Sequence, residues 1–279
     1  MAAKLLKMTN ISKSFGSNKV LDGIEIEVDR GEVVALLGEN GAGKSTLIKI
    51  LGGIYHADTG NVYIDGVEKN IQTAADAGRE GIRIIHQEIV LVPDRTIAAN
   101  VFLGREIKKH GLIDYKAMRD ETQKVLDDLK IPLDADDQIR DLTLGMQQLV
   151  EIVKAVSADA KIVVMDEPTS SLSQAETETL FTIIGRLKAK GVGIIYISHR
   201  LDELFQITDR ILIIRDGISV GNVETKTAVR EELVNMMVGR ELTSYYTKSN
   251  RKIGNVALDV KNLCNTDQGI KNLNFHVKY

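Results

Sequence analysis

Residues 38–46 form a glycine-rich run that ends in a lysine and two hydroxyl side chains: Gly38, Glu39, Asn40, Gly41, Ala42, Gly43, Lys44, Ser45 and Thr46. The run fits the pattern G-x-x-x-x-G-K-[ST], in which backbone N–H groups wrap around phosphate oxygens. An apolar run typical of a strand precedes it at 33–37, and a helical pattern follows at 46–51 and stops at Gly52. The spacing therefore predicts a bound nucleoside triphosphate, with Lys44 at its outer oxygens and the Ser45 hydroxyl on Mg²⁺.

Two adjacent carboxylates follow a second apolar run. Residues 162–165 read as a buried strand, and Asp166 and Glu167 come directly after it. The carboxyl ends of such strands form the crevice in which α/β sheets bind ligands. Because neighbouring residues point in different directions, we expect Asp166 to hold magnesium and Glu167 to face an attacking water. Taken alone, the two residues are equally typical of an acidic strand end with no catalytic role.

The elements around these motifs predict an α/β fold. From 161 to 214 strand and helix patterns alternate, which favours a mostly parallel sheet covered by helices. Residues 4–30 instead alternate apolar and polar side chains around a turn at 16–18, as antiparallel strands do. We therefore predict a P-loop NTPase with a mixed core sheet and antiparallel N-terminal strands.

A helical insertion interrupts this core. Between about residues 90 and 160 strand-like runs are scarce, and helical spacing is clearest at 117–129 and 146–157. The phosphate-binding core is therefore expected to carry a separate helical subdomain over that range.

Composition limits the classes of function. The chain has 279 residues and a formal net charge of −3, so there is no global electrostatic case for binding nucleic acid. Cys264 is the only cysteine, which excludes an internal disulfide and suits a reducing cytosol. No apolar run approaches the roughly 18 residues of a membrane span, and Lys4 and Lys7 interrupt any signal-peptide core. We expect any membrane association to come through a partner.

The C-terminal segment echoes the N-terminal one. Residues 257–263 resemble 5–11, and residues 270–277 resemble 21–28. We predict a first domain at 1–245, a linker at 246–254, and the truncated start of a second, similar domain at 255–279. A chance hairpin is the alternative.

Six elements together resemble the ATP-binding-cassette (ABC) ATPase family, over about residues 4–245. In the order of that family they are Phe15, the loop at 38–46, Gln87 in the run IIHQE, the loop at 142–148, the stretch 166–173, and His199 in the run YISHR.

The resemblance assigns a role to each element. Phe15 would stack on adenine, Gln87 would touch magnesium and sense a membrane partner, and His199 would contact the γ-phosphate. The implied catalytic residues are Glu167, His199, Lys44 and Gln87. The implied cofactors are ATP and Mg²⁺, with the metal held by Ser45, Gln87 and Asp166.

The loop at 142–148 matches the signature loop of the family only in part. Thr143 keeps a hydroxyl and Gly145 keeps a glycine at the start of a helix, so both are expected to bind a phosphate. Leu144 and Met146 replace the usual glycine and glutamine. Because this loop closes over the nucleotide of the opposing domain in that family, the changes put the partner's site in doubt, not the one built on Lys44.

Four further stretches resemble the first half of tandem ATPases from bacterial monosaccharide importers of the ribose, galactose, xylose and autoinducer-2 type: 55–60, 84–88, 100–106 and 236–242. The implied function is ATP hydrolysis that powers sugar import, at the cytoplasmic face of the cell membrane. The implied partners are a second cassette domain of the same polypeptide, integral membrane permease subunits and, indirectly, a periplasmic or lipoprotein sugar-binding protein, with no nucleic acid. These stretches contact no sugar in such systems, so they do not identify the sugar.

Two other interpretations share the nucleotide motifs. One is a soluble tandem cassette that acts as an ATP-controlled clamp on ribosomes or DNA, against which stand the sequence pI of about 6.0 and the lack of basic runs. The other is a nucleotide-binding module with little activity alone, because the opposing domain that completes the site is missing.

Overall fold

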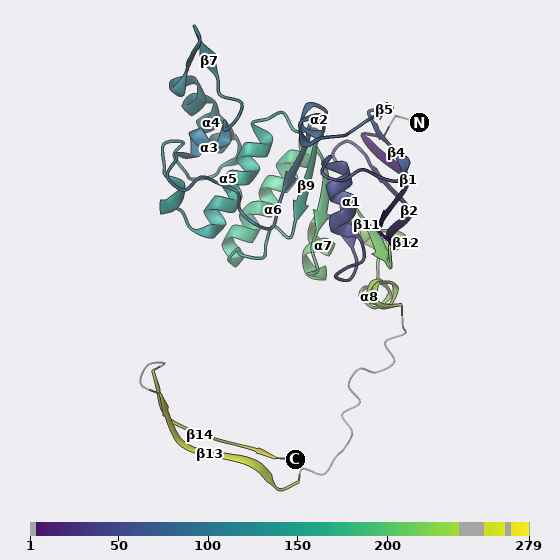
Figure 1. Ribbon diagram of the computed structural model, residues 1–279. Helices are drawn as coiled ribbons and strands as arrows, with labels where there is room; N and C mark the ends of the chain where they lie inside the picture. Colours follow the sequence, from purple (N-terminus) through teal and green to yellow (C-terminus); the bar gives the residue numbers. More distant parts are fainter. Residues whose placement is uncertain (1–3, 240–253, 266–268, 279) are drawn as a thin grey trace. The chain divides into compact units, whose positions relative to one another are not determined.

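The computed structural model describes residues 4–239, 254–265 and 269–278 (Figure 1). The chain divides into two compact units, Met1–Arg240 and Glu241–Tyr279, and each is described by itself. The predicted domain boundary at 245 and residues 246–253 of the predicted linker lie outside the described residues.

A six-stranded sheet forms the centre of the first unit (Figure 1). Its strand order is β12-β11-β3-β10-β9-β6. All neighbouring pairs are parallel except β11 with β12, which makes the sheet mixed as predicted. The strands are β3 (Val33–Leu37), β6 (Ile82–Ile85), β9 (Ile162–Asp166), β10 (Gly193–Ile197), β11 (Arg210–Arg215) and β12 (Ile218–Glu224).

Both faces of this sheet are covered, which explains the continuous apolar runs of its central strands. Alternate residues of β3, such as Val34 and Leu36, pack with helix α1 (Lys44–Leu51) and a four-stranded antiparallel sheet. The intervening residues pack on the other face with helix α6 (Gln174–Ala189) and the helical insertion. The antiparallel sheet has the order β2-β1-β4-β5, with β1 (Leu6–Phe15), β2 (Asn18–Val28), β4 (Thr59–Ile64) and β5 (Val67–Lys69).

The insertion holds helices α3 (Ile97–Val101), α4 (Tyr115–Leu129) and α5 (Leu144–Val156). Both α4 and α5 begin two residues before the predicted start. The reason is capping, since Asp114 and Thr143 accept hydrogen bonds from the first free N–H groups of these helices. A two-stranded hairpin of β7 (Lys108–Lys109) and β8 (Leu112–Ile113) also lies here, and the sequence pattern did not predict it.

Three short helices complete the unit: α2 (Ala74–Arg79), α7 (Leu201–Ile207) and α8 (Arg230–Val238). Two 3₁₀ turns lie at Ile139–Asp141 and Thr225–Thr227. Across the described ranges, no helix combines the length and the apolar character that crossing a membrane requires.

The second unit is an antiparallel hairpin of β13 (Val256–Asn265) and β14 (Ile270–Lys278). Its register repeats that of β1 and β2. The pairs Leu258–Val277, Val260–Phe275 and Leu263–Leu273 stand where the first unit has Leu6–Val28, Met8–Ile26 and Ile11–Ile24. Asn10 and Asn262, both with positive φ, also stand at the same irregularity in the two hairpins.

Candidate functional site

The phosphate-binding loop joins β3 to α1, as the sequence predicts. Lys44 is the first residue of α1, and its Nζ donates to the carbonyl oxygens of Gly38 at 2.7 Å and Glu39 at 2.9 Å. The ammonium group therefore lies over the loop and beside the positive end of the helix dipole. Burial lowers the pKa of Lys44, while the nearby carboxylates of Asp166 and Glu167 oppose that shift.

Two glycines of the loop are required by packing as well as by the motif. Gly43 has φ of +105°, and a Cβ on it would lie 2.5 Å from Cδ2 of Leu21 on β2. A Cβ on Gly38 would lie 2.3 Å from the carbonyl oxygen of Ile214 on β11. The loop is thus held between two strands, and its amides are fixed in place before any ligand arrives.

A pocket of about 310 Å³ opens at this loop, and we call it the phosphate pocket. It brings together loop residues, an amide and the two carboxylates: Asn40, Gly41, Gly43, Lys44, Ser45, Thr46, Gln87, Asp166 and Glu167, with Val20 and Ile197. Gly38 and Glu39 line an adjoining pocket together with Glu167 and His199. Burial raises the pKa of Asp166, and the negative charge of Glu167 raises it further, so a cation in the pocket would relieve both effects.

The donor set of the phosphate pocket fits a hard divalent cation. Over the described parts of the chain, no group of three or more His, Cys, Asp and Glu residues could hold a metal. The three predicted ligands Ser45, Gln87 and Asp166 all line the pocket, and they supply a hydroxyl, an amide and a carboxylate. Oxygen ligands of this kind, few in number and completed by phosphate oxygens, are what Mg²⁺ takes in phosphoryl-transfer sites.

Glu167 and His199 form the second part of the site, and we call them the catalytic pair after the role that the sequence predicts for them. His199 Nδ1 lies 3.1 Å from Glu167 Oε1, and Gln87 Nε2 lies 3.5 Å from Glu167 Oε2. Glu167 has φ of +47°, a left-handed conformation that is uncommon for a residue with a side chain. Its N–H donates to the carbonyl oxygen of Ile197 at 2.9 Å, which ties the end of β9 to the end of β10. The carboxylate is thereby turned toward the pocket mouth, where a general base is useful.

Phe15 stands apart from the phosphate pocket. It ends β1, is 44% exposed, and meets Tyr55 edge to face with ring centroids 5.2 Å apart. Lys13 Nζ lies 5.6 Å from the Phe15 ring centroid. An exposed, buttressed ring of this kind can stack on a base. The sequence pattern gave no role to Tyr55, because an aromatic after a helix is usually a core residue.

The structure does not bring Thr143 and Gly145 to the phosphate pocket. Both lie at the start of α5, where Thr143 accepts from the N–H of Met146 at 3.2 Å. The carboxylate of Glu176 accepts from the Thr143 hydroxyl at 3.2 Å, and a Cβ on Gly145 would lie 2.2 Å from it. A side chain at 145 would therefore displace the Glu176 carboxylate from the start of α5.

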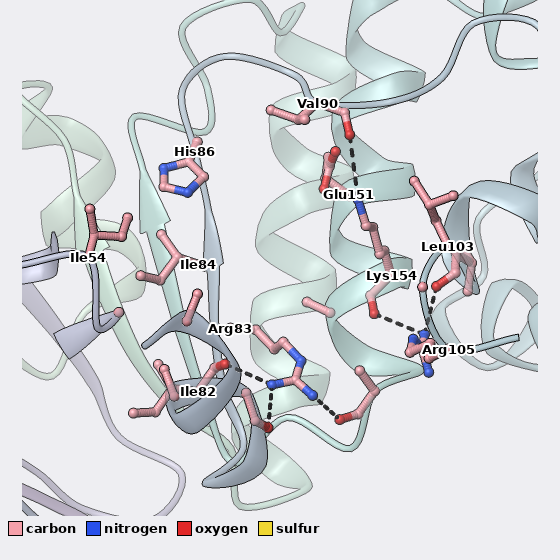
Figure 2. Close-up of a pocket in the computed structure, with 18 of the residues that line it drawn as sticks. Ile54, Ile82, Arg83, Ile84, His86, Val90, Leu103, Arg105, Glu151 and Lys154 are labelled. Atoms are coloured by element: carbon pink, nitrogen blue, oxygen red, sulfur yellow. Dashed lines mark hydrogen bonds and ion pairs between the residues drawn. The ribbon is translucent and has the colours of Figure 1, made fainter. Parts of the chain in front are cut away.

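A second hollow, which we call the subdomain groove, lies between β6 with α2 and the helical insertion (Figure 2). Its volume is about 790 Å³, and exposed apolar side chains such as Ile54 and Leu103 line it. Arg83 donates to the carbonyl oxygens of Gly78 at 2.7 Å and Ala158 at 3.1 Å. Arg105 caps the end of α5 through the carbonyl oxygen of Ser157 at 2.8 Å.

The groove carries more positive than negative charge. Within the described ranges, neither Arg83 nor Arg105 has an ion-pair partner, and burial lowers the pKa of each. Lys154 Nζ lies 3.7 Å from Glu151 and donates to the Val90 carbonyl oxygen at 3.4 Å (Figure 2). The surface therefore suits a partner with an apolar face and a negative charge.

Comparisons with known proteins agree with this geometry. The family model described as "ABC transporter" matches residues 21–170. The chain is 47% identical over 274 residues to the ribose import ATP-binding protein RbsA of Lactococcus lactis subsp. cremoris, a match that covers 98% of this chain and 55% of the relative. It is 45% identical to the protein of the same name from Clostridium tetani, covering 98% and 54%. The chain thus spans about half the length of the curated relatives it matches.

Solved structures give the same result. The ADP conformation of MJ1267, an ATP-binding cassette of an ABC transporter, is 29% identical with a TM-score of 0.75, covering 85% of this chain and 99% of that one. A nucleotide-free cassette from an ABC transporter is 28% identical with a TM-score of 0.73, covering 85% and 96%. The predicted fold and the resemblance stated on the sequence are confirmed: the chain belongs to the ABC transporter family and has the fold of its ATP-binding cassettes.

Proposed function

We propose that this chain binds ATP with Mg²⁺ in the phosphate pocket and hydrolyses it to ADP and phosphate, to power the import of a monosaccharide. The observation that carries the proposal is the convergence of Lys44, Asp166 and the catalytic pair on one pocket mouth. These residues come from three separate segments, so their meeting is a product of the fold.

The chemistry is phosphoryl transfer to water, in which positioning and charge do most of the work. Lys44 and the loop amides hold the phosphate oxygens. Glu167 accepts a proton from the attacking water, and His199, 3.1 Å away, steadies that carboxylate and the γ-phosphate. Ser45, Gln87 and Asp166 would hold Mg²⁺, which neutralises the charge that develops on the phosphate oxygens.

Import is proposed from the relatives and the subdomain groove. The similar proteins are named for ribose import, and a monosaccharide is the substrate class that this supports. We infer that a cytoplasmic helix of an integral membrane permease subunit docks in the groove, with its apolar face against Ile54 and Leu103 and an acidic residue toward Arg83 and Arg105. Such docking would hold the chain at the cytoplasmic face of the membrane, while a separate sugar-binding protein selects the sugar.

A second cassette domain is the other proposed partner. The repeated register of β13 and β14 supports the assignment of residues 255–279 to the start of that domain. In the first hairpin Leu6, Ile26 and Val28 are buried by the core, whereas Leu258, Phe275 and Val277 are exposed. Apolar side chains in that register are what a second core would cover.

Titration calorimetry and a mutant pair test the nucleotide chemistry. The chain should take up ATP in the presence of Mg²⁺, and Lys44→Ala should abolish that uptake. In the complete importer, Glu167→Gln should retain ATP binding and lose hydrolysis by about 10²–10⁴-fold. An exposed glutamate on α4 provides the control, since Glu121→Gln should leave both unchanged. Normal turnover of Glu167→Gln would refute the catalytic assignment.

A second pair of variants tests the docking surface. Leu103→Asp places a carboxylate in the groove, and Leu112→Asp places one on the exposed hairpin outside it. We expect Leu103→Asp to prevent copurification with the membrane subunits and to leave ATP affinity unchanged. The control Leu112→Asp should change neither copurification nor ATP affinity. Copurification with ribosomes in place of membrane subunits would favour the clamp interpretation.

A further inference from the structure

A buried carboxylate lies behind the catalytic pair. Glu203 is on α7, and its side chain is only 5% exposed. It accepts hydrogen bonds from three hydroxyl groups, those of Thr169 at 2.9 Å, Tyr196 at 3.0 Å and Ser198 at 3.1 Å. Its one ion pair among the described residues is with Arg200. A guanidinium nitrogen of Arg200 lies 2.6 Å from Oε1 of Glu203, and the Arg200 side chain is half exposed.

Two of the three donors of this network, Thr169 and Ser198, belong to the two loops that present the catalytic pair. Thr169 is two residues beyond Glu167, and Ser198 directly precedes His199. The Ser198 hydroxyl also accepts from the N–H of Arg200 at 3.0 Å, which fixes the backbone on the far side of His199. Glu203 is therefore attached to both loops at once, and it does not line the phosphate pocket.

The Glu203 network is stable only when the carboxylate has all of its hydrogen-bond donors. A buried charge is tolerated where donors surround it, and each missing donor leaves an unpaired group at substantial cost. Burial and the charge of Glu203 together raise the pKa of Tyr196, so its hydroxyl stays a donor at physiological pH. Thr169 and Ser198 are themselves buried, so water cannot replace the carboxylate as their acceptor.

We propose that Glu203 is a positioning residue for ATP hydrolysis, which holds the loops of Glu167 and His199 in one fixed relation. This inference rests on the function proposed above. Glu203 does not touch the nucleotide. It acts by keeping the 3.1 Å contact of the catalytic pair aimed at the water, because displacements of about 1 Å at a reacting group can lower rates by 10²-fold.

The direct test is Glu203→Gln, which keeps the shape and replaces one acceptor oxygen by a donor. In the complete importer we expect kcat to fall by about 10–10²-fold with little change in KM. Calorimetry on the chain should find the affinity for ATP with Mg²⁺ unchanged. The control is Glu32→Gln, which breaks a similarly buried pair with Arg210, 2.6 Å long and remote from the pocket. That variant should lower the unfolding temperature and leave kcat as it is.

Two milder variants keep the test decisive if Glu203→Gln fails to fold. Ser198→Ala removes the donor next to His199, whereas Tyr196→Phe removes a donor to the same carboxylate from within β10. A positioning role predicts a larger fall in kcat for Ser198→Ala than for Tyr196→Phe, even though both lose one bond to Glu203. Equal falls that follow the loss of stability would overturn the proposal.

A double mutant separates this proposal from the proposed function. If Glu203 acts through Glu167, adding Glu203→Gln to Glu167→Gln should lower the residual rate no further. Unchanged kcat in Glu203→Gln, with Glu167→Gln inactive, would refute the positioning role and leave the ATPase assignment intact. Unchanged kcat in Glu167→Gln would instead refute the catalytic assignment itself.

Discussion

Replacing Gly43 by alanine should damage the phosphate loop much more than replacing Gly41 in the same loop. Gly43 has φ of +105°, and the added Cβ would lie 2.5 Å from Leu21 Cδ2 and 3.0 Å from the Val20 carbonyl oxygen. The side chain of Leu21 is fully buried, so it cannot move into solvent. Either the loop or the start of β2 must shift, and the amides that face the phosphates shift with the loop.

Alanine at two other glycines separates the cost of a left-handed backbone from the cost of overpacking. Gly16 and Gly41 also have positive φ, +61° and +86°, but a Cβ on either would meet nothing within 4 Å. For these, alanine costs only the left-handed conformation, about 1–2 kcal/mol. At Gly43 the same cost adds to overpacking of about 1–3 kcal/mol. The difference between Gly43→Ala and Gly41→Ala should therefore be about 1–3 kcal/mol in the free energy of unfolding.

Urea unfolding of the three variants measures these costs, and calorimetry with ATP and Mg²⁺ measures the effect on the loop. Gly16→Ala should bind ATP normally, because Gly16 lies in the turn between β1 and β2. Gly43→Ala should lose affinity well beyond its loss of stability. If Gly43→Ala and Gly41→Ala proved equally stable, the packing of the loop against β2 would not be what fixes its amides, and the argument for a preformed phosphate site would fail.

Three further predictions concern the rest of the site. Phe15→Ala should weaken ATP binding by about 1–3 kcal/mol, which is the free energy of stacking one base on an aromatic ring. The binding of inorganic triphosphate should be unchanged, and the exposed Phe275→Ala is the control. Asp166→Asn should stabilise the nucleotide-free chain at pH 8 but not at pH 3, which lies below the ordinary aspartate pKa of 3.8. The folded-state pKa of Asp166 is raised, so its ionised form costs stability that appears as pH rises through that pKa and is absent below the unfolded value; an equal gain at both pH values in thermal melts would contradict this. Thr143→Val should remove a helix cap worth about 1 kcal/mol and leave the ATP affinity of the isolated chain unchanged, because Thr143 lies outside the phosphate pocket.

The parts of the site that are local in sequence could be predicted from the residues alone. The phosphate loop is one continuous run, and its flanking strand and helix are β3 and α1 with nearly the predicted bounds. The placement of Asp166 and Glu167 at a strand end follows from the apolar run before them. These motifs carry their own structural context, so no tertiary information was needed.

The contacts between distant segments could not be derived in this way. Gln87 and His199 lie 80 and 32 residues from Glu167, and only the family resemblance singled them out. Glu203 escaped notice because an acidic residue early in a short helix is ordinarily a solvated one. Its burial depends on Thr169, from the loop after β9, and on Tyr196, from β10, which no local pattern encodes. The hairpin of β7 and β8 has two residues in each strand, too few for a period to be recognised.

The subdomain groove and the loop of Thr143 and Gly145 are connected by a single rigid element. Helix α5 begins at the loop of Thr143 and Gly145, and its other end supplies Glu151 and Lys154 to the subdomain groove. Its 13 residues span roughly 20 Å. Arg105 caps one end of α5, and the Glu176 carboxylate accepts a hydrogen bond from Thr143 at the other end. The two ends of the helix therefore move together. A partner seated in the groove would therefore displace the signature loop directly, with no need for a chain of small rearrangements through the core.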